Sequence, residues 1–133
     1  MRFWKEILVL CIGGVLYCII ELLWRGRTHL SMFLLGGSCF WLIGSFNRVG
    51  NLSVLTQMLL GTVTIVALEF AVGVMFNRRL EIWNYSDLPL NLMGQICLPY
   101  ALLWFPLSAA AIFAEDAVRH ALFSQCVPQY RWI

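Results

Sequence analysis

Residues 21–32, ELLWRGRTHLSM, place a carboxylate, a tryptophan, two arginines and a histidine between two long apolar segments. The first apolar segment begins near Trp4, and the second continues to Phe46. Trp4 and Trp24 are separated by about 20 residues, which in an α-helix corresponds to about 30 Å, the thickness of the bilayer hydrocarbon core. Tryptophan is enriched at both membrane interfaces. This stretch therefore predicts a hairpin of two transmembrane helices.

The composition of the whole chain agrees with a membrane location. The 133 residues are 61% hydrophobic and only 12% charged, with a mean hydropathy of +0.80, whereas soluble domains carry about 25% charged residues. We expect an integral membrane protein of the cell membrane, with residues 1–133 forming a single transmembrane domain. The net charge of +2 predicts no nucleic-acid partner, and membrane lipids are the expected surroundings.

Four apolar segments are long enough to cross a bilayer. We expect an all-α membrane protein, a bundle of four transmembrane helices over about residues 4–24, 30–46, 53–76 and 94–114, followed by a short polar tail, 115–133. We interpret Glu115 and Asp116 as a solvated helix end and expect a short amphipathic helix from there to Phe123. The connection 77–93, NRRLEIWNYSDLPLNLM, is too long and too mixed for a turn, so it should be structured or re-entrant.

The number of spans predicts which segments share a face of the membrane. The connections after the first and third helices should lie at one face, and both termini with the connection 47–52 at the other. Basic residues are nearly balanced, five at the termini face against four, so the positive-inside rule does not fix the orientation. A small chain with so little bias could pair with an oppositely inserted copy, which leaves a homodimer or a partner membrane subunit open.

Charged residues of the first hairpin form one candidate group. Glu21 and Arg25 have the i,i+4 spacing of a helical ion pair. Either the pair simply closes the helix end, or Arg25 and Arg27 clamp an anionic headgroup with their forked donors. His29 is either an interfacial side chain or a proton-transfer group, since imidazole titrates near neutrality.

Glu69 is the strongest single candidate for substrate binding or proton coupling. A carboxylate within a transmembrane segment is costly in lipid, so it should face the bundle and lie near Arg25, His29 or the start of the fourth helix. The following connection adds five candidates at the same face: Trp83, Tyr85, Asp87, Asn91 and Gln95. We interpret the two aromatic residues as interfacial anchors or ligand platforms, and the two amides as candidates to shape and cap the fourth helix. No metal or cofactor site is predicted.

Together these residues resemble the small integral-membrane family described as Putative ABC-transporter type IV, also called CmpB-like. The resemblance covers roughly residues 12–106, and the matching residues are Glu21, Trp24, Arg25, His29, Ser31, Met32, Gly36, Gly37, Glu69, Gly73, Asn77, the run WNYSDLPLN and Gly94-Gln95. The resemblance implies a permease-like membrane protein with no established substrate. Asn84 stands where the motif would carry aspartate, which weakens an acid/base role at that position.

Three functions are compatible with this pattern. The first is a transporter or permease-like protein for an unidentified substrate, in which Glu69 and Glu21 exchange proton, arginine and substrate. The second is a membrane-embedded enzyme or lipid-binding protein acting on an anionic amphiphile, and the third is a non-catalytic subunit that stabilises a partner. The chain has no GxxxxGK loop and one lysine, Lys5, so it binds no ATP in the P-loop manner itself. The family resemblance favours transport.

Overall fold

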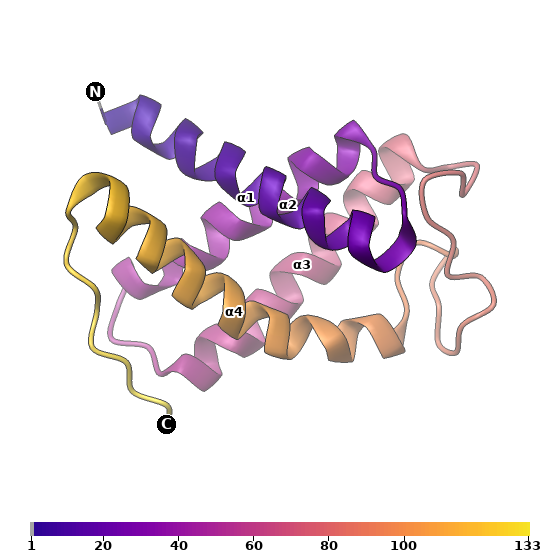
Figure 1. The fold of residues 1–133 in the computed structure, drawn as a ribbon. Coiled ribbons are helices and arrows are strands. Elements are labelled where there is room, and N and C mark those ends of the chain that lie inside the picture. The colour runs from indigo at the N-terminus through magenta and orange to yellow at the C-terminus, as the bar shows by residue number, and fades with distance from the viewer. Residues whose placement is uncertain (1) are drawn as a thin grey trace.

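The computed structural model describes residues 2–133, and four long helices dominate it (Figure 1). In chain order the elements are α1 (Arg2–Arg25), α2 (Leu30–Ser45), the 3-10 turn η1 (Phe46–Arg48), α3 (Val54–Phe76) and α4 (Leu98–Phe123). All four spans, with α2 counted together with η1, are long and apolar enough to cross a membrane. Residues 2–133 contain no strand beyond one isolated bridge. The predicted all-α bundle of four transmembrane helices is confirmed.

The fourth helix has different ends from those predicted, since it runs from Leu98 to Phe123 instead of over 94–114. It begins later because residues before Leu98 belong to the structured connection, where Gly94 takes a left-handed φ of 67°. It ends later because Glu115, Asp116 and Arg119 are buried in the bundle, so the predicted amphipathic segment continues the same helix.

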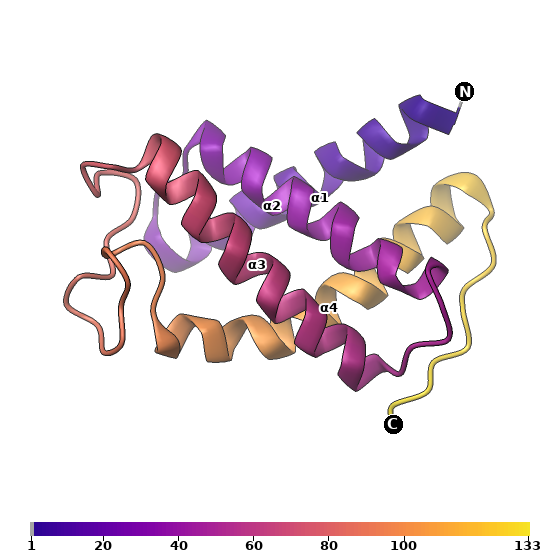
Figure 2. The same cartoon turned by 180° about the vertical axis from the view of Figure 1, so that it is seen from behind.

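The hairpin of α1 and α2 is packed through small residues. A Cβ atom on Gly36 would collide with the side chain of Tyr17, and one on Gly37 would collide with the carbonyl oxygen of Leu10. Glycine at both positions therefore lets the two backbones approach closely. On the other side, α3 packs against α4 and α2, whereas α1 makes few contacts with α4 (Figures 1 and 2).

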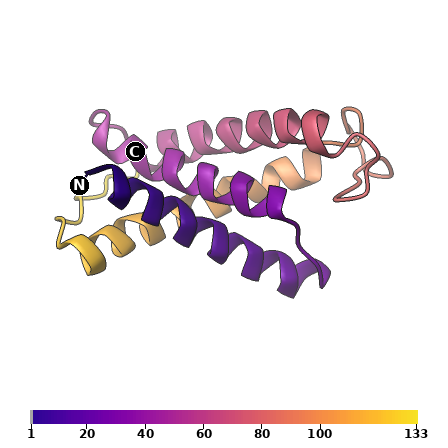
Figure 3. The same cartoon turned by 90° about the horizontal axis from the view of Figure 1, so that it is seen from above.

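The two ends of the bundle carry different segments, as Figure 3 shows from above. We call the end formed by residues 26–29 and 77–97 the loop end, where Arg25 Nη1 donates to the carbonyl oxygen of Ile82 at 2.8 Å. We call the opposite end the terminal end. There the start of α1, residues 46–53 and the C-terminal segment 124–133 meet, and Arg131 donates to the carbonyl oxygen of Asn51 at 2.8 Å. The predicted arrangement of the connections is confirmed.

The C-terminal segment 124–133 is irregular but is bound to the start of α3. The backbone N–H of Val54 donates to the carbonyl oxygen of Arg131 at 2.7 Å, and that of Leu55 donates to Trp132 at 3.3 Å. The first backbone N–H groups of a helix have no partner within the helix. The segment therefore supplies acceptors that α3 itself lacks.

Candidate functional site

Asn77 organises the connection at the loop end. Its Nδ2 donates to the carbonyl oxygen of Trp83 at 2.7 Å and to Gln95 Oε1 at 3.0 Å, while its Oδ1 accepts from the backbone N–H of Ile82 at 2.8 Å. Gln95 Nε2 in turn donates to the carbonyl oxygen of Asn77 at 2.9 Å. These buried bonds hold residues 77–97 together and join them to the end of α3.

Trp83 and Gln95 are part of this unit and do not contact Glu69 through a hydrogen bond. The indole N–H of Trp83 donates to the carbonyl oxygen of Gln95 at 2.8 Å, and both side chains are 2% exposed. The interpretation of Trp83 as an interfacial anchor is wrong, because its ring faces the interior. Gln95 shapes the connection against Gly73, and the residue that precedes α4 directly is Cys97.

Asn91 and Asp87 lie on the exposed side of the connection. Asn91 donates to the carbonyl oxygens of Ser86 and Leu88 and accepts from the N–H of Gly94. Its role is to fix the turn. Asn84 Oδ1 accepts from the N–H of Ser86 at 2.9 Å, a bond that an aspartate carboxylate would also accept, so the departure from the family motif leaves the turn intact.

Glu69 faces the bundle interior, as expected, and is 1% exposed. Tyr85 donates its hydroxyl to Oε2 at 3.0 Å, and the indole N–H of Trp104 donates to Oε1 at 3.2 Å. Tyr85 is positioned by stacking on Tyr100, with ring centroids 4.7 Å apart and planes at 15°. Each carboxylate oxygen thus has one neutral donor.

The hydroxyl of Tyr85 is a permanent donor at neutral pH. Burial raises its pKa above the usual tyrosine value, and the neighbouring carboxylate of Glu69 raises this pKa further. The side chain of Tyr85 therefore stays protonated and fixes the orientation of the carboxylate.

Trp104 and Tyr100 were not among the residues predicted from the sequence. They lie on α4 with i,i+4 spacing, and their ring centroids are 5.9 Å apart. That spacing is visible in the sequence and indicates a shared helix face. The sequence does not show that this face of α4 packs against α3, so the contact of Trp104 with Glu69 could not be predicted.

Glu21 and Arg25 form the predicted ion pair. Arg25 Nη2 lies 2.5 Å from Glu21 Oε2, and Tyr17 donates its hydroxyl to Glu21 Oε1 at 3.1 Å. Since the guanidinium also binds the carbonyl oxygen of Ile82, Arg25 ties α1 to the connection 77–97. No hydrogen bond or ion pair within residues 2–133 joins Arg25 to Glu69.

His29 has a structural place at the start of α2. Its Nδ1 accepts from the backbone N–H of Ser31 at 3.1 Å and lies 2.8 Å from the Ser31 hydroxyl. It caps the helix and is not bonded to Glu69. Of the predicted site residues, the structure joins Glu69 to Tyr85 directly and places His29, Asp87 and Asn91 in other environments.

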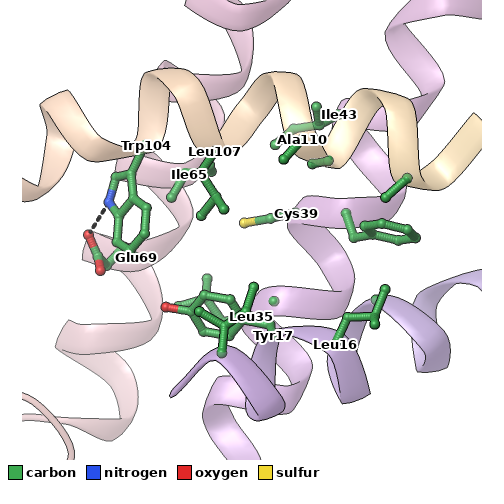
Figure 4. Close-up of a pocket in the computed structure, with 16 residues that line it drawn as sticks. Leu16, Tyr17, Leu35, Cys39, Ile43, Ile65, Glu69, Trp104, Leu107 and Ala110 are labelled. Carbon is green, nitrogen blue, oxygen red and sulfur yellow. Dashed lines mark hydrogen bonds between the residues drawn. The ribbon is translucent and has the colours of Figure 1, made fainter. Parts of the chain in front are cut away.

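A cavity of about 130 Å³ extends from Glu69 along the middle of the bundle (Figure 4). Figure 4 shows Glu69 and Trp104 at one end and apolar side chains along the remainder. Three lining residues, Leu16 and Ile20 of α1 and Ala110 of α4, are also exposed. The cavity therefore reaches the lipid-facing surface between α1 and α4.

The terminal end holds a second polar cluster, which was not predicted from the sequence. Glu115 is 0% exposed and accepts from Arg119 Nε at 2.5 Å and from Arg48 at 3.3 Å. Arg119 also binds Glu6 at 2.7 Å, and Trp41 donates its indole N–H to Glu6 at 2.6 Å. The prediction of a solvated helix end at Glu115 is wrong, and polar side chains gather at both faces of the membrane, not at one.

Asp116 belongs to the same cluster and is 5% exposed. It accepts from Asn47 Nδ2 at 2.6 Å and from the Tyr130 hydroxyl at 2.8 Å. Burial and the neighbouring carboxylate of Asp116 raise the pKa of Tyr130, so its hydroxyl stays protonated and donating. The i,i+4 spacing of Glu115 and Arg119 was the signal that could have revealed this cluster.

Within residues 2–133 no group of three His, Cys, Asp or Glu side chains is suitably placed to hold a metal ion.

The sequence and the structure were compared with known proteins. Neither the curated proteins nor the solved structures give a match. Residues 7–133, nearly the whole chain, match the model of one protein family. The chain therefore belongs to the family described as Putative ABC-transporter type IV.

Proposed function

We propose that this protein binds a hydrophobic molecule that enters from the bilayer between α1 and α4, as the substrate-binding step of a permease-like transport function in the cell membrane. The observation that carries this proposal is the apolar cavity that ends at Glu69 and reaches the lipid-facing surface. Ligand sites are typically concave, mainly apolar and supplied with a few convergent polar groups. This cavity has that composition.

The route through the bundle supports a hydrophobic substrate over a hydrophilic one. Ile65 lies one helical turn from Glu69 on α3, and Ile112 lies just under one turn before Glu115 on α4, both in the buried core. Ile43, at 0% exposure, also belongs to this core. A hydrophilic solute would lose its hydration between the two polar ends, whereas a hydrophobic one can move along the boundary between protein and lipid.

The family description supports transport as the purpose of such binding. Because this chain has no P-loop, any ATP-driven step would require a nucleotide-binding partner. Enzymatic action on an anionic amphiphile has less support. His29 caps α2, Asp87 is exposed on the connection, and the guanidinium of Arg25 is engaged by Glu21 and Ile82.

The proposal is tested with a photoactivatable long-chain alcohol incorporated into nanodiscs that contain the purified protein. We expect labelled peptides to come from the cavity-lining parts of α1 and α4. Ala110→Trp, at the opening, should lower this labelling about tenfold, the effect of losing about 1.4 kcal/mol of binding free energy. Ala117→Trp is the matched control, because Ala117 is exposed on the same helix and does not line the cavity.

Labelling spread evenly over all lipid-facing residues and unchanged by Ala110→Trp would contradict the proposal. Fractionation of cells with an antibody to the protein tests the location, since recovery outside the cell membrane would contradict that part.

A further inference from the structure

We propose that the ligand of this cavity is a hydrophobic cation, an amphiphile with an amine or quaternary ammonium group, and that Glu69 is its counterion. This inference rests on the proposed function and specifies the chemical class of the substrate.

The charge of the cavity is the first argument. Of the 16 residues that line it, Glu69 is the only one with an acidic or basic side chain of the Asp, Glu, Lys, Arg or His type. The remaining lining is aliphatic or aromatic apart from glycine and Cys39. An anionic amphiphile would bring a second negative charge to a site that contains no basic side chain.

The partners of Glu69 are the second argument. The salt bridges within residues 2–133 occupy the other buried or partly buried glutamates of the helices, namely Glu6, Glu21 and Glu115. Asp116 accepts from the neutral donors Asn47 and Tyr130 but does not line the cavity. Glu69 has only the neutral donors Tyr85 and Trp104. A carboxylate at this depth without an ion-pair partner is costly, and a ligand cation would supply that partner.

The aromatic rings beside Glu69 are the third argument. Tyr17 and Trp104 line the cavity, and Tyr100 and Tyr85 continue the aromatic group behind Trp104. The negative face of an aromatic ring attracts a cation, and the attraction is stronger when the contact is desolvated. Aromatic rings next to a carboxylate form the environment in which quaternary ammonium groups are held.

The experiment uses three photoactivatable probes with the same alkyl chain and different head groups: trimethylammonium, hydroxyl and sulfonate. Each is added to nanodiscs at equal concentration in the membrane, and labelling of the cavity-lining peptides is measured. We expect the ammonium probe to label the cavity about tenfold more than the sulfonate probe. Glu69→Gln should abolish this preference, so that the ammonium probe labels the cavity no more than the sulfonate probe does. Cavity labelling by the hydroxyl probe that persists in this variant shows that it is folded.

Two further variants complete the test. Glu69→Asp keeps the charge and should retain the preference for the ammonium probe. Glu81→Gln removes an exposed carboxylate of the loop end that does not line this cavity, and it should change nothing.

Equal labelling by all three probes, a preference for sulfonate, or a preference that survives Glu69→Gln would overturn the inference and leave the proposed function in place. Absence of cavity labelling by every probe would overturn both.

Discussion

Glu69 and Glu115 are buried carboxylates near opposite ends of the bundle, and their neighbours differ. Glu115 accepts from Arg119 and Arg48, so its charge is neutralised by the chain itself. Among the described residues 2–133, Glu69 accepts only from a tyrosine and a tryptophan, and it lies at the end of a cavity. Asp116 is also buried and accepts from the neutral donors Asn47 and Tyr130, but it does not line the cavity. What sets Glu69 apart is therefore the combination of neutral partners with a place at the end of the cavity.

Glu115→Gln should have the largest effect on stability. The substitution leaves Arg119, whose side chain is 4% exposed, with only Glu6 as a charged partner. Breaking a buried ion pair by removing one member costs about 3–5 kcal/mol. The free energy of unfolding, measured by titrating the protein in mixed micelles with sodium dodecyl sulfate, should fall by about 3 kcal/mol. Glu81→Gln serves as the control and should leave it unchanged.

Asn77→Ala should have the second largest effect, and it acts at the loop end. It leaves the carbonyl oxygen of Trp83, the side chain of Gln95 and the N–H of Ile82 without their present partner. The free energy of unfolding should fall by about 2–3 kcal/mol, since each buried group left unpaired is costly. Residues 77–97 should also become accessible to protease. Glu81→Gln, which changes an exposed side chain of the same connection, is the control and should leave protease resistance intact.

Tyr130→Phe tests a neutral contact of the terminal end. Asp116 would lose one of its two donors but keep Asn47. We expect a loss of about 1 kcal/mol in the free energy of unfolding, the usual net value of a hydrogen bond. Gln129→Ala, exposed on the same segment, should cost measurably less. A loss as large as that from Glu115→Gln would mean that neutral and charged partners contribute equally here.

Glu69→Gln should have the smallest effect, less than about 1 kcal/mol. An amide keeps the shape of the side chain and its oxygen still accepts one hydrogen bond, while the hydroxyl of Tyr85 can accept from the new NH₂ group. The same unfolding assay compares this variant directly with Glu115→Gln. If the two variants were equally destabilised, Glu69 would be a structural residue and the contrast between the two ends would be lost.

The sequence predicted what depends on local pattern. Hydropathy located the four spans, the order of the spans placed the connections, and the i,i+4 spacing of Glu21 and Arg25 predicted their ion pair. The cost of a carboxylate in lipid predicted that Glu69 faces inward. Each of these predictions follows from the residue pattern along the chain and the properties of the bilayer, without knowledge of which helices contact each other.

What escaped prediction depends on how helices meet. Arg48 reaches Glu115, and Arg119 reaches Glu6, across long separations in the chain. Gly44 leaves the space that the buried Glu115 side chain fills, which no pattern within α4 indicates. Trp83 could be interpreted from the sequence as an interfacial anchor or a ligand platform, because an aromatic residue beyond a span is often interfacial. Its burial depends on bonds with Asn77 and Gln95, which lie elsewhere in the chain.

The contact between the C-terminal segment and α3 also bears on the order of assembly in the membrane. Arg131 and Trp132 are synthesised after α4, yet they accept from the first N–H groups of α3. A nascent chain that has inserted α1 to α3 therefore exposes an incomplete amino end of α3 at the membrane surface until the last span has followed. Completion of the terminal end is coupled to the arrival of α4, so a chain stopped before residue 131 should enter the bilayer but remain open at that end.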